Sequence, residues 1–449
     1  EFHEDLNVLS NSFDFDCRLV VEAPEDGDYY FSIGGWSDAG EQVSELLPAD
    51  PFDSGSGFGV ASQGIYTVTL GLDAEDRDCF RFDLAPGDII GTSGSGGDSL
   101  TVRVLDPAGR LRIGSITDRS LFYPDASPLP RGGVAAHLVA VESGEHTVCF
   151  DGRPADYGAQ LQVFRPVLES RGSSQTFFID FDGATLERSI FPFGPDGEIT
   201  LSPLSSFLAA WDLLPEDEDA VIDGVVGAFR ENLLDDLQSL SNPSFSVRIL
   251  NSRDHADPFG QPNVSRIIIG GSTAESGLFD MIHYESIDPG NFAVEETGLI
   301  QLDELSEPVG NVAFFTLNRI EIAPDASKTD LVGLALGNFA SQAAGYLLGA
   351  WNTERRLVGS PTTIMDSRFD TSFEGFDRPS PIGLGPDGVF GTSDDIDVDF
   401  AEDRFAFEAR FMGFQDTAEL LARTLAAGDV IFVDGFESGT TEAWTFSSP

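Results

Sequence analysis

The sequence predicts a multidomain protein in which antiparallel β-sandwich modules precede an α/β (α+β) domain with a mixed sheet. The chain of 449 residues is too long for one ordinary domain and long enough for several hydrophobic cores. Up to residue 166, short apolar segments alternate with Gly, Pro and Asp turns, which is typical of sandwiches. From residue 175, strand patterns and helix patterns alternate, as they do around a mixed sheet.

The composition excludes several kinds of partner. The 76 acidic residues against 25 basic ones give a formal charge of −51, and Lys328 is the only lysine. Such a field repels nucleic acid and anionic membranes, so we expect neither as a partner. The sequence has no apolar run of about 18 residues, so we expect no membrane span. A hydrophobic content of 41% with 37 Phe predicts folded domains rather than disorder.

The first expected module, residues 1–62, consists of short strands such as Cys17–Val21 and Tyr29–Ile33. Its start, EFHEDLNV, has no basic and apolar leader, so we expect that a signal peptide was removed or never present. The segment Leu6–Val21 could add to a sheet edge of a neighbouring copy, as exposed strands do. This suggests self-association into a filament or surface layer.

The second expected module, residues 63–168, has the regular spacing of an antiparallel sandwich. Its strand candidates are Ile65–Leu70, Cys79–Leu84, Leu100–Leu105, Leu138–Val141, His146–Phe150 and Ala159–Phe164. The stretches GIYTVTLGLDAEDRDCFRFDLAPGDIIG, LTVRVLDPAGR, GEHTVCF and YGAQLQVF occur in this order, and they resemble the bacterial pre-peptidase C-terminal (PPC) domain. The resemblance implies a secreted module that binds, stabilises or targets. An unrelated sandwich is the alternative.

Three cysteines, Cys17, Cys79 and Cys149, lie in the N-terminal third of the chain. In an oxidising compartment one pair could form a disulfide, but the sequence does not fix which pair. Cys79 and Cys149 lie on expected strands without a partnering histidine motif. A disulfide or buried thiols are therefore expected there rather than a nucleophile.

The third expected domain, residues 175–428, begins with the apolar strand QTFFIDFDGA (Gln175–Ala184). Apolar residues then recur at helical spacing over Asp219–Leu240, with charges between them. Further strands are expected at Phe245–Leu250, Arg266–Gly270 and Val312–Leu317, and a second long helix at Asp330–Ala350. This alternation predicts the mixed sheet.

The stretches NFASQAAGYLLGAWNT (Asn338–Thr353) and PTTIMD (Pro361–Asp366) together resemble the active site of metzincin metallopeptidases. The zinc motif of that family is HExxHxxGxxH, in which histidines at i and i+4 share a helix face and a Glu acts as general base. The glycine turns the chain so that a third His reaches the metal, and a methionine turn lies below. FIDFDGA, NSRDHADPFGQPNVSRIIIGG, ESIDPGNFAVEE and GPDGVFGTSDDIDVDF are similar to a secreted bacterial metzincin-like family.

The resemblance implies a bent active-site-type helix whose catalytic groups have been replaced. The glycine and the methionine turn are kept, whereas Gln, Tyr and Asn stand at the three ligand positions and Ala at the general base: Gln342, Ala343, Tyr346, Gly349, Asn352 and Met365. Neutral Gln, Tyr and Asn are poor zinc ligands, and Ala cannot accept a proton. We therefore expect a pseudopeptidase without zinc, in which the three polar side chains hydrogen-bond among themselves.

The acidic stretch Asp387–Asp399, DGVFGTSDDIDVD, is the better candidate for an ion site. Its carboxylates offer hard oxygens for calcium around a glycine-bent turn, with Asp387, Asp394, Asp395 and Asp397 as the possible ligands. The alternative is a solvated strand that points its acidic residues outward (Asp395, Asp397 and Asp399) and its apolar residues inward (Ile396, Val398 and Phe400).

Other motifs for catalysis are weak. The five histidines form no i, i+4 pair, and no GxSxG nucleophile elbow occurs: His3, His137, His146, His255 and His283. We expect His255 and His283 to be structural or loop residues.

Within the segment 429–449, the stretch DVIFVDGFESGTTEAW (Asp429–Trp444) resembles a short C-terminal segment of many secreted proteobacterial proteins, for which sorting, anchoring and packing are open roles. Together these resemblances imply a secreted, extracellular bacterial protein that is catalytically inactive. We expect it to act by binding a protein partner or by self-association into a surface or filament. The alternatives are an active zinc metallopeptidase with non-standard ligands, and a peptide-binding decoy or inhibitor.

Overall fold

The computed structural model describes the following residues: 76–96, 100–152, 157–166, 174–238, 240, 246–279, 281–293, 295–309, 316–354, 363–366, 382–406, 409–424 and 428–434. The chain divides into two compact units, Glu1–Leu72 and Asp73–Pro449, and all the described residues belong to the second. The expected module 1–62, including Cys17 and the segment Leu6–Val21, lies outside the described residues, as does the expected strand Ile65–Leu70.

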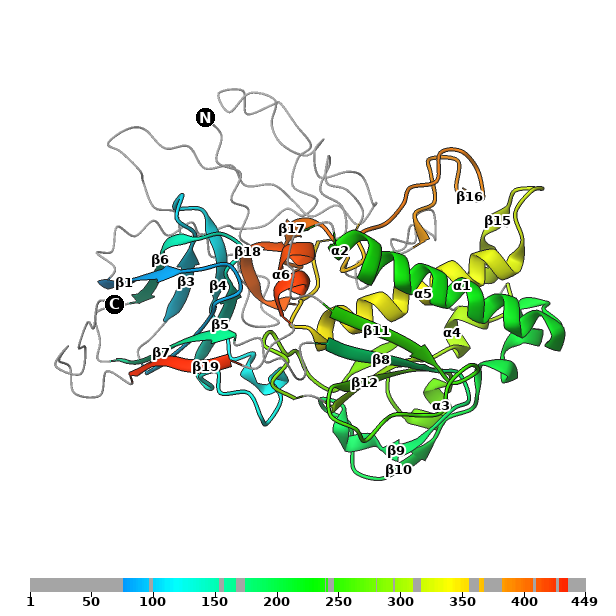
Figure 1. Cartoon of the computed structure of the whole chain (residues 1–449), viewed down its shortest axis with the longest axis horizontal. Helices are drawn as coiled ribbons and strands as arrows, with labels where there is room; N and C mark the ends of the chain where they lie inside the picture. Colours follow the sequence, from blue (N-terminus) through cyan, green and yellow to red (C-terminus); the bar gives the residue numbers. More distant parts are fainter. Residues whose placement is uncertain are drawn as a thin grey trace, which may run out of the picture. The chain divides into compact units, whose positions relative to one another are not determined.

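Two antiparallel sheets form a sandwich-like part of the second unit (Figure 1). The first sheet has the order β1 (Asp76–Leu84), β6 (Gly144–Gly152), β3 (Thr101–Leu105), β4 (Leu111–Ser115), β18 (Phe411–Asp416) and β17 (Glu402–Arg404). The second has the order β19 (Gly428–Asp434), β7 (Tyr157–Pro166), β2 (Ile89–Gly96) and β5 (Val134–Val139). Buried side chains such as Val104, Phe150 and Leu161 contribute to a common hydrophobic core. The protein is thus β-rich and of the α+β type, as the sequence predicts at this coarser level.

Both sheets of the sandwich include strands from the C-terminal part of the chain, β17 and β18 in the first and β19 in the second. β18 pairs with β4, and β19 pairs with β7, both antiparallel. The sandwich therefore extends beyond the expected boundary at residue 168 and includes part of the segment 429–449, whose role the sequence leaves open.

The cysteines Cys79 and Cys149 form a disulfide. They are direct partners in the register of β1 and β6, with their Cα atoms 4.1 Å apart. Of the alternatives that the sequence left open, the structure therefore has the disulfide.

The second part of the unit is built on a five-stranded mixed sheet. Its order is β11 (Ser246–Asn251), β8 (Ser174–Asp180), β12 (Val264–Ile269), β14 (Glu295–Ile300) and β13 (Ile282–Tyr284). The first four strands are parallel, and β13 runs antiparallel to β14. The mixed sheet is the arrangement that the alternation of strands and helices predicts.

Two helices lie side by side over one face of this sheet (Figure 1). α1 (Glu218–Arg230) continues through a π-helical turn, Glu231–Asp235, into α2 (Asp236–Gln238), and the second helix is α5 (Lys328–Leu347). A Cβ atom added to Gly333 of α5 would lie 2.9 Å from the Cα of Gly224 in α1, so glycine lets the two backbones touch. The helix expected at Asp219–Leu240 is therefore present but interrupted by the π turn.

The remaining elements are short. They are β9 (Thr185–Glu187), β10 (Glu198–Thr200), α3 (Thr273–Ser276), α4 (Asp303–Ser306), β15 (Glu321–Ile322), β16 (Val389–Phe390) and α6 (Thr417–Arg423), with several 3-10 turns between them. The strand expected at Val312–Leu317 falls largely outside the described residues, and Leu317 begins a 3-10 turn. Among the described residues, no helix has the length and apolar character needed to cross a membrane.

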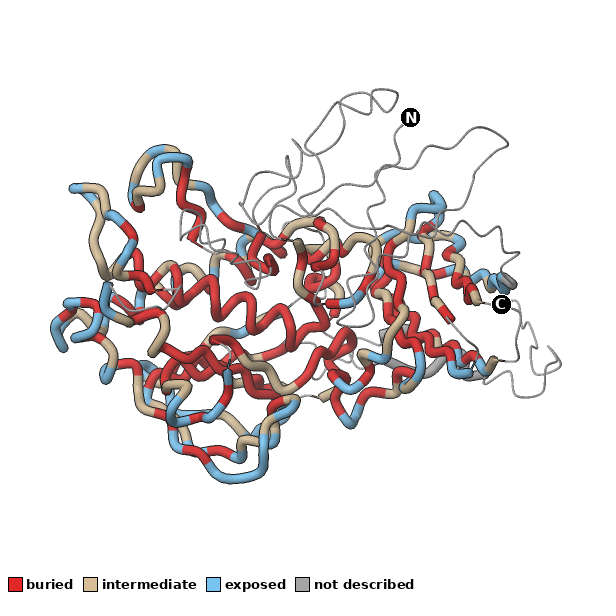
Figure 2. The backbone as a smooth tube through the Cα atoms, turned by 180° about the vertical axis from the view of Figure 1, so that it is seen from behind, coloured by how far each residue is buried: buried red, intermediate tan, exposed pale blue. Residues whose placement is uncertain are grey.

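α5 is buried along almost its whole length (Figure 2). Its N-terminus is fixed by a capping box, in which the Ser327 hydroxyl accepts from the Asp330 N–H and the Asp330 carboxylate accepts from the Ser327 N–H. Its apolar and small residues then face the sheet on one side and α1 on the other. A helix that is apolar all round is a core helix, and α5 positions the candidate site at its C-terminal end.

Candidate functional site

The chain leaves α5 through a glycine bend. The helix ends at Leu347, and Gly349 has φ +96°, a conformation that L side chains rarely adopt. The Ala350 N–H returns to the Gly345 carbonyl at 2.9 Å. A Cβ atom at position 349 would lie 2.2 Å from the Cα of Pro289, so both the dihedral angle and the space require glycine.

The methionine of PTTIMD lies beneath this helix end. Thr353, just after the bend, donates its N–H to the Met365 carbonyl at 2.9 Å, which ties the two segments together. Met365 is completely buried, and a Cβ atom added to Gly345 would lie 2.6 Å from its sulfur. The thioether therefore fills the space that the absent side chain of Gly345 leaves.

Gln342, Tyr346 and Asn352, which the sequence resemblance aligns with zinc ligands, are buried or half-buried, and each takes part in a hydrogen bond. The Tyr346 hydroxyl donates to the side-chain carbonyl of Asn352, across the bend. Gln342 donates from Nε2 to the backbone carbonyl of Asp366 at 3.2 Å. The expected bonding among the three is thus present for Tyr346 and Asn352, whereas Gln342 bonds to the methionine turn.

The residue that the sequence resemblance aligns with the general base makes an apolar contact. Ala343 is completely buried, and a Cβ atom added to Gly298 of β14 would lie 3.3 Å from the Ala343 Cβ. One helical turn later, the Tyr346 ring stacks on Tyr284 of β13, with centroids 4.1 Å apart and planes at 24°. Both contacts fix the helix against the antiparallel edge of the sheet.

A histidine from the sandwich reaches the bend, which the sequence did not indicate. His137 lies on β5, and its Nε2 is 3.3 Å from the Gly349 carbonyl while its Nδ1 is 3.0 Å from the Tyr123 hydroxyl. Burial lowers the pKa of His137 to about 4, so the ring is neutral at pH 7. Because a carbonyl only accepts, Nε2 carries the proton and Nδ1 accepts from Tyr123. His137 and Gly349 are 212 residues apart in the chain, so no local sequence pattern predicts their contact.

A series of aromatic rings connects the surface to this site. Phe193 is 80% exposed, and its φ of +63° is strained for a bulky residue. Its ring lies 5.9 Å from that of Phe122, which lies 6.1 Å from Tyr284 and 5.6 Å from Trp351. Tyr284 in turn stacks on Tyr346. The rings thus run from an exposed side chain to Tyr346 at the candidate site.

The structure does not bring the four predicted calcium ligands together. Three of them accept hydrogen bonds from backbone N–H groups of their own loop: Asp387 from Val389 at 2.9 Å, Asp394 from Asp387 at 3.3 Å, and Asp395 from Gly391 at 2.6 Å. They close the loop on itself. Asp397 lies in a different group of carboxylates.

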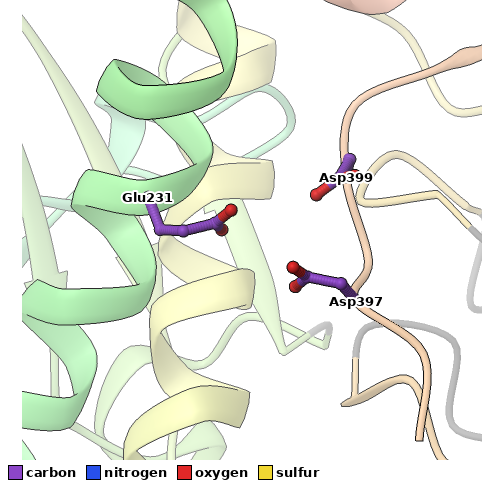
Figure 3. Close-up of side chains that lie close together, drawn as sticks. All are labelled: Glu231, Asp397 and Asp399. Atoms are coloured by element: carbon purple, nitrogen blue, oxygen red, sulfur yellow. The ribbon is translucent and has the colours of Figure 1, made fainter.

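That group consists of Glu231, Asp397 and Asp399, whose side chains point toward one another from the π turn after α1 and from the acidic stretch (Figure 3). One carboxylate oxygen of each lies within 4.8 Å of the others. The pKa of Glu231 is raised to about 8. Partial burial is the largest cause, and repulsion from the carboxylates of Asp236, Asp397 and Asp399 adds to it. These oxygens are of the kind that hard cations such as calcium prefer. The sequence did not predict Glu231 as a member of this group, because the π turn that carries it is far in the chain from Asp397 and Asp399.

The expected solvated strand over 395–400 is only partly present. The stretch forms no regular strand, although Val398 and Phe400 are buried and Asp397 and Asp399 are exposed. Ile396 breaks the alternation, because it is 50% exposed.

The two histidines expected to be structural contact nearby groups. His283 lies 2.8 Å from Gln301 Nε2, with its ring 5.8 Å from that of Phe191. His255 is exposed, and its Nδ1 is 3.3 Å from the Asn251 carbonyl.

Comparison with known proteins adds little. No protein-family description matches the chain, and no curated protein matches it. A solved structure described as the GM1 bound form of the ECX AB5 holotoxin is similar at 10% identity and a TM-score of 0.24. The match covers 63% of this chain and 92% of the other. A TM-score this low supports no statement about fold or function.

Proposed function

We propose that the protein is a catalytically inactive, metzincin-like protein of the extracellular space that acts by binding a protein partner or by assembling with copies of itself. The observation that carries this proposal is the hydrogen bond between Tyr346 and Asn352. In the resemblance, these two residues occupy the positions of the second and third zinc-binding histidines.

The chemistry of the site argues against hydrolysis. A metallopeptidase needs three ligands that hold zinc and a base that accepts a proton from the bound water. Here a phenol and an amide bond to each other, a second amide bonds to the Asp366 carbonyl, and Ala343 offers no acceptor. The groups that would have to bind a metal are thus engaged with protein atoms.

The shape around the site supports the metzincin-like part of the proposal. The helix ends at a glycine bend, Met365 packs under Gly345, and both lie beside a mixed sheet. These are the features that the resemblance implies apart from the catalytic groups. Packing of this kind needs no metal, because the core is filled by side chains.

The extracellular part rests on the disulfide and the charge. Disulfides persist in oxidising compartments and are rare in the cytosol, and the Cys79–Cys149 pair joins two neighbouring strands. A formal charge of −51 suits a surface that stays soluble in salt.

The proposal is tested by metal analysis together with a peptidase assay on the purified full chain. We expect no stoichiometric zinc and no cleavage of unfolded protein substrates with zinc added. Stoichiometric zinc that disappears in Asn352→Ala would instead establish a peptidase with non-standard ligands. Sedimentation of the same sample tests the choice between the two modes of action, since self-assembly gives a concentration-dependent mass and partner binding does not.

The exposed end of the aromatic series favours a second candidate, a decoy that holds peptide without cleaving it. Phe193 is held outward in a strained conformation beside Phe122, which suggests a contact for an apolar side chain. Binding of an unfolded protein that is lost in Phe193→Ala would support the decoy. Phe279→Ala is the matched control, because Phe279 is 100% exposed and has no such ring contact among the described residues. Equal losses of binding in both variants would indicate nonspecific hydrophobic adsorption and contradict the decoy.

A further inference from the structure

A second group of polar side chains is buried at the amino ends of the parallel strands. Gln175, Ser265 and Glu296 are each the second residue of their strand, in β8, β12 and β14. Ser286, Asp288 and Asn291, from the segment between β13 and β14, complete the group. All six side chains belong to residues that are at most 4% exposed. None of them belongs to the zinc-motif positions or to the acidic loop.

Hydrogen bonds and register connect these residues into one group. Asn291 donates from Nδ2 to Gln175 Oε1 at 3.1 Å, and Gln175 donates from Nε2 to Ser265 Oγ at 2.8 Å. Ser265 is the register partner of Glu296 across the β12–β14 pair. The Ser286 hydroxyl donates to Glu296 Oε1. These side chains therefore lie together at the amino ends of the parallel strands.

Two buried oxygens in this group accept no hydrogen bond from the described residues: Glu296 Oε2 and Asn291 Oδ1. Leaving such atoms unpaired in the interior is costly, and far more so for a carboxylate. Asp288 is also completely buried, and its carboxylate accepts from the Ala293 N–H at 2.7 Å and the Gly290 N–H at 3.4 Å.

Among the residues that the structure describes, no basic side chain forms an ion pair with this group. Burial raises the pKa of both Asp288 and Glu296, and the charged groups that further raise that of Glu296 are Asp288 and Glu285, which are acidic themselves. Two neighbouring buried carboxyls without a basic partner need protons or a metal cation.

We propose that Asp288, Asn291 and Glu296 bind a buried divalent cation of the calcium type. Calcium takes oxygen ligands from carboxylates and amide carbonyls, and the two unpaired oxygens are one of each kind. Two carboxylates balance its charge. The six residues of the group include no imidazole or thiolate, so zinc is not the ion that fits.

The segment between β13 and β14, which carries Asp288 and Asn291, also contacts the sandwich, so an ion bound to it affects how the two parts pack. Ile287, next to Asp288, donates its N–H to the Phe122 carbonyl of the sandwich at 2.7 Å. The Phe292 ring packs edge-on against Phe164 of β7, with centroids 5.8 Å apart. An ion on Asp288 and Asn291 therefore fixes the segment that joins the sandwich to the mixed sheet.

The test begins with the unaltered full-length protein. After dialysis against calcium-free buffer, metal analysis should find one retained calcium per chain, and a chelator should lower the Tm by about 5 °C or more. Terbium exchanged into this site should luminesce with a lifetime that indicates few bound water molecules, because the ligands are buried. Absence of a retained ion, or a lifetime typical of a well-hydrated ion, would overturn the proposal.

Variants then locate the ion. Glu296→Gln keeps the shape of the side chain and removes its charge, so the retained ion and the response of Tm to chelator should both disappear. If the group holds protons instead, Glu296→Gln will be at least as stable as the parent protein.

The matched control is Glu231→Gln in the half-exposed carboxylate group, which should keep the retained ion. Loss of the ion in Glu231→Gln but not in Glu296→Gln would place it in the other group. None of these results depends on the zinc-motif positions, so they test this site separately from the proposed function.

Discussion

The hydroxyl of Tyr346 and the side-chain carbonyl of Asn352 are hydrogen-bonded to each other across the bend at Gly349. The bond joins the end of α5 to the segment that follows the bend. In the proposed function, these are two of the side chains that would have to bind the metal, and each is engaged with the other. The proposal is therefore a site with the shape of a metal centre and without its metal-binding groups.

The proposed metzincin-like geometry predicts that three substitutions create a zinc site. A variant with Gln342→His, Tyr346→His and Asn352→His should bind one zinc ion per chain, because the proposal places the three positions around one metal. Adding Ala343→Glu should give measurable hydrolysis, because only then is a general base present. Zinc content and a peptidase assay are the measurements. The triple variant serves as the control for the fourth change, and failure of a folded triple variant to bind zinc would contradict the metzincin-like geometry.

Gly349→Ala should be strongly destabilising. The added methyl would meet the Pro289 backbone at 2.2 Å in addition to the strain at φ +96°, and we expect a loss of about 3 kcal/mol or more in the free energy of unfolding. Gly109→Ala is the matched control, because Gly109 has φ +82° but nothing within 4 Å of an added Cβ. It should cost only about 1 kcal/mol. Denaturant unfolding measures both, and equal losses would show that the contact with Pro289 is unimportant.

His137 predicts a loss of stability in acid. Its folded pKa of about 4 lies below the unfolded value of 6.5, so the unfolded state binds the proton first as the pH falls. The stability contributed by the neutral ring is complete above pH 6.5 and is lost between pH 6.5 and 4, by about 3 kcal/mol. His137→Gln should flatten this part of the profile. His255→Gln, which alters an exposed ring, should leave it unchanged.

The carboxylates around Glu231 predict the opposite dependence. The pKa of Glu231 is raised from 4.5 to about 8, so the folded state holds a proton that the unfolded state has already released. Its contribution is complete below pH 4.5 and is lost as the pH rises to 8 and beyond. Glu231→Gln should therefore raise the Tm at pH 8 to 9 and change it little at pH 5. Glu187→Gln, which alters an exposed residue of β9, is the control. An unchanged Tm at high pH would mean that the repulsion is relieved in solution.

The sequence predicted the elements whose signals are local. The apolar alternation at 79–84, 100–105, 146–150 and 159–164 corresponds to strands, and the helical periodicity over 330–350 corresponds to α5. β2 was missed because its sequence, IIGTSGSG, reads as a loop. Gly91 leaves room for its neighbours, since an added Cβ atom would lie 2.7 Å from the Leu129 side chain and 2.8 Å from Pro130.

The candidate site divides in the same way. Gln342, Ala343, Tyr346 and Asn352 follow one another along a helix and its bend, so a motif placed them. His137 and Glu231 come from other elements and carry no pattern of their own. Packing of the sheets and helices brings these two residues to their sites, and no local sequence pattern predicts that packing.

The C-terminal strands predict a sharp dependence on chain length. A chain that stops after Ala406 lacks β18 and β19, leaves edges of both sandwich sheets unpaired, and should lose the cooperative unfolding of the sandwich. A chain that stops after Asp434 keeps both strands and should unfold like the parent protein. Thermal unfolding followed by circular dichroism distinguishes the two. A stable sandwich in the shorter chain would show that the pairings are dispensable.

These pairings also reverse the usual order of events during synthesis. A ribosome releases the N-terminal strands first, yet β4 and β7 meet their last partners only when residues 411–416 and 428–434 have emerged. The mixed sheet, which lies between them in the chain, can therefore be complete before the sandwich that precedes it. Pairing between strands so distant in the chain is slow. Until residues 428–434 have been synthesised, the unpaired edges of β4 and β7 can bind chaperones or other chains.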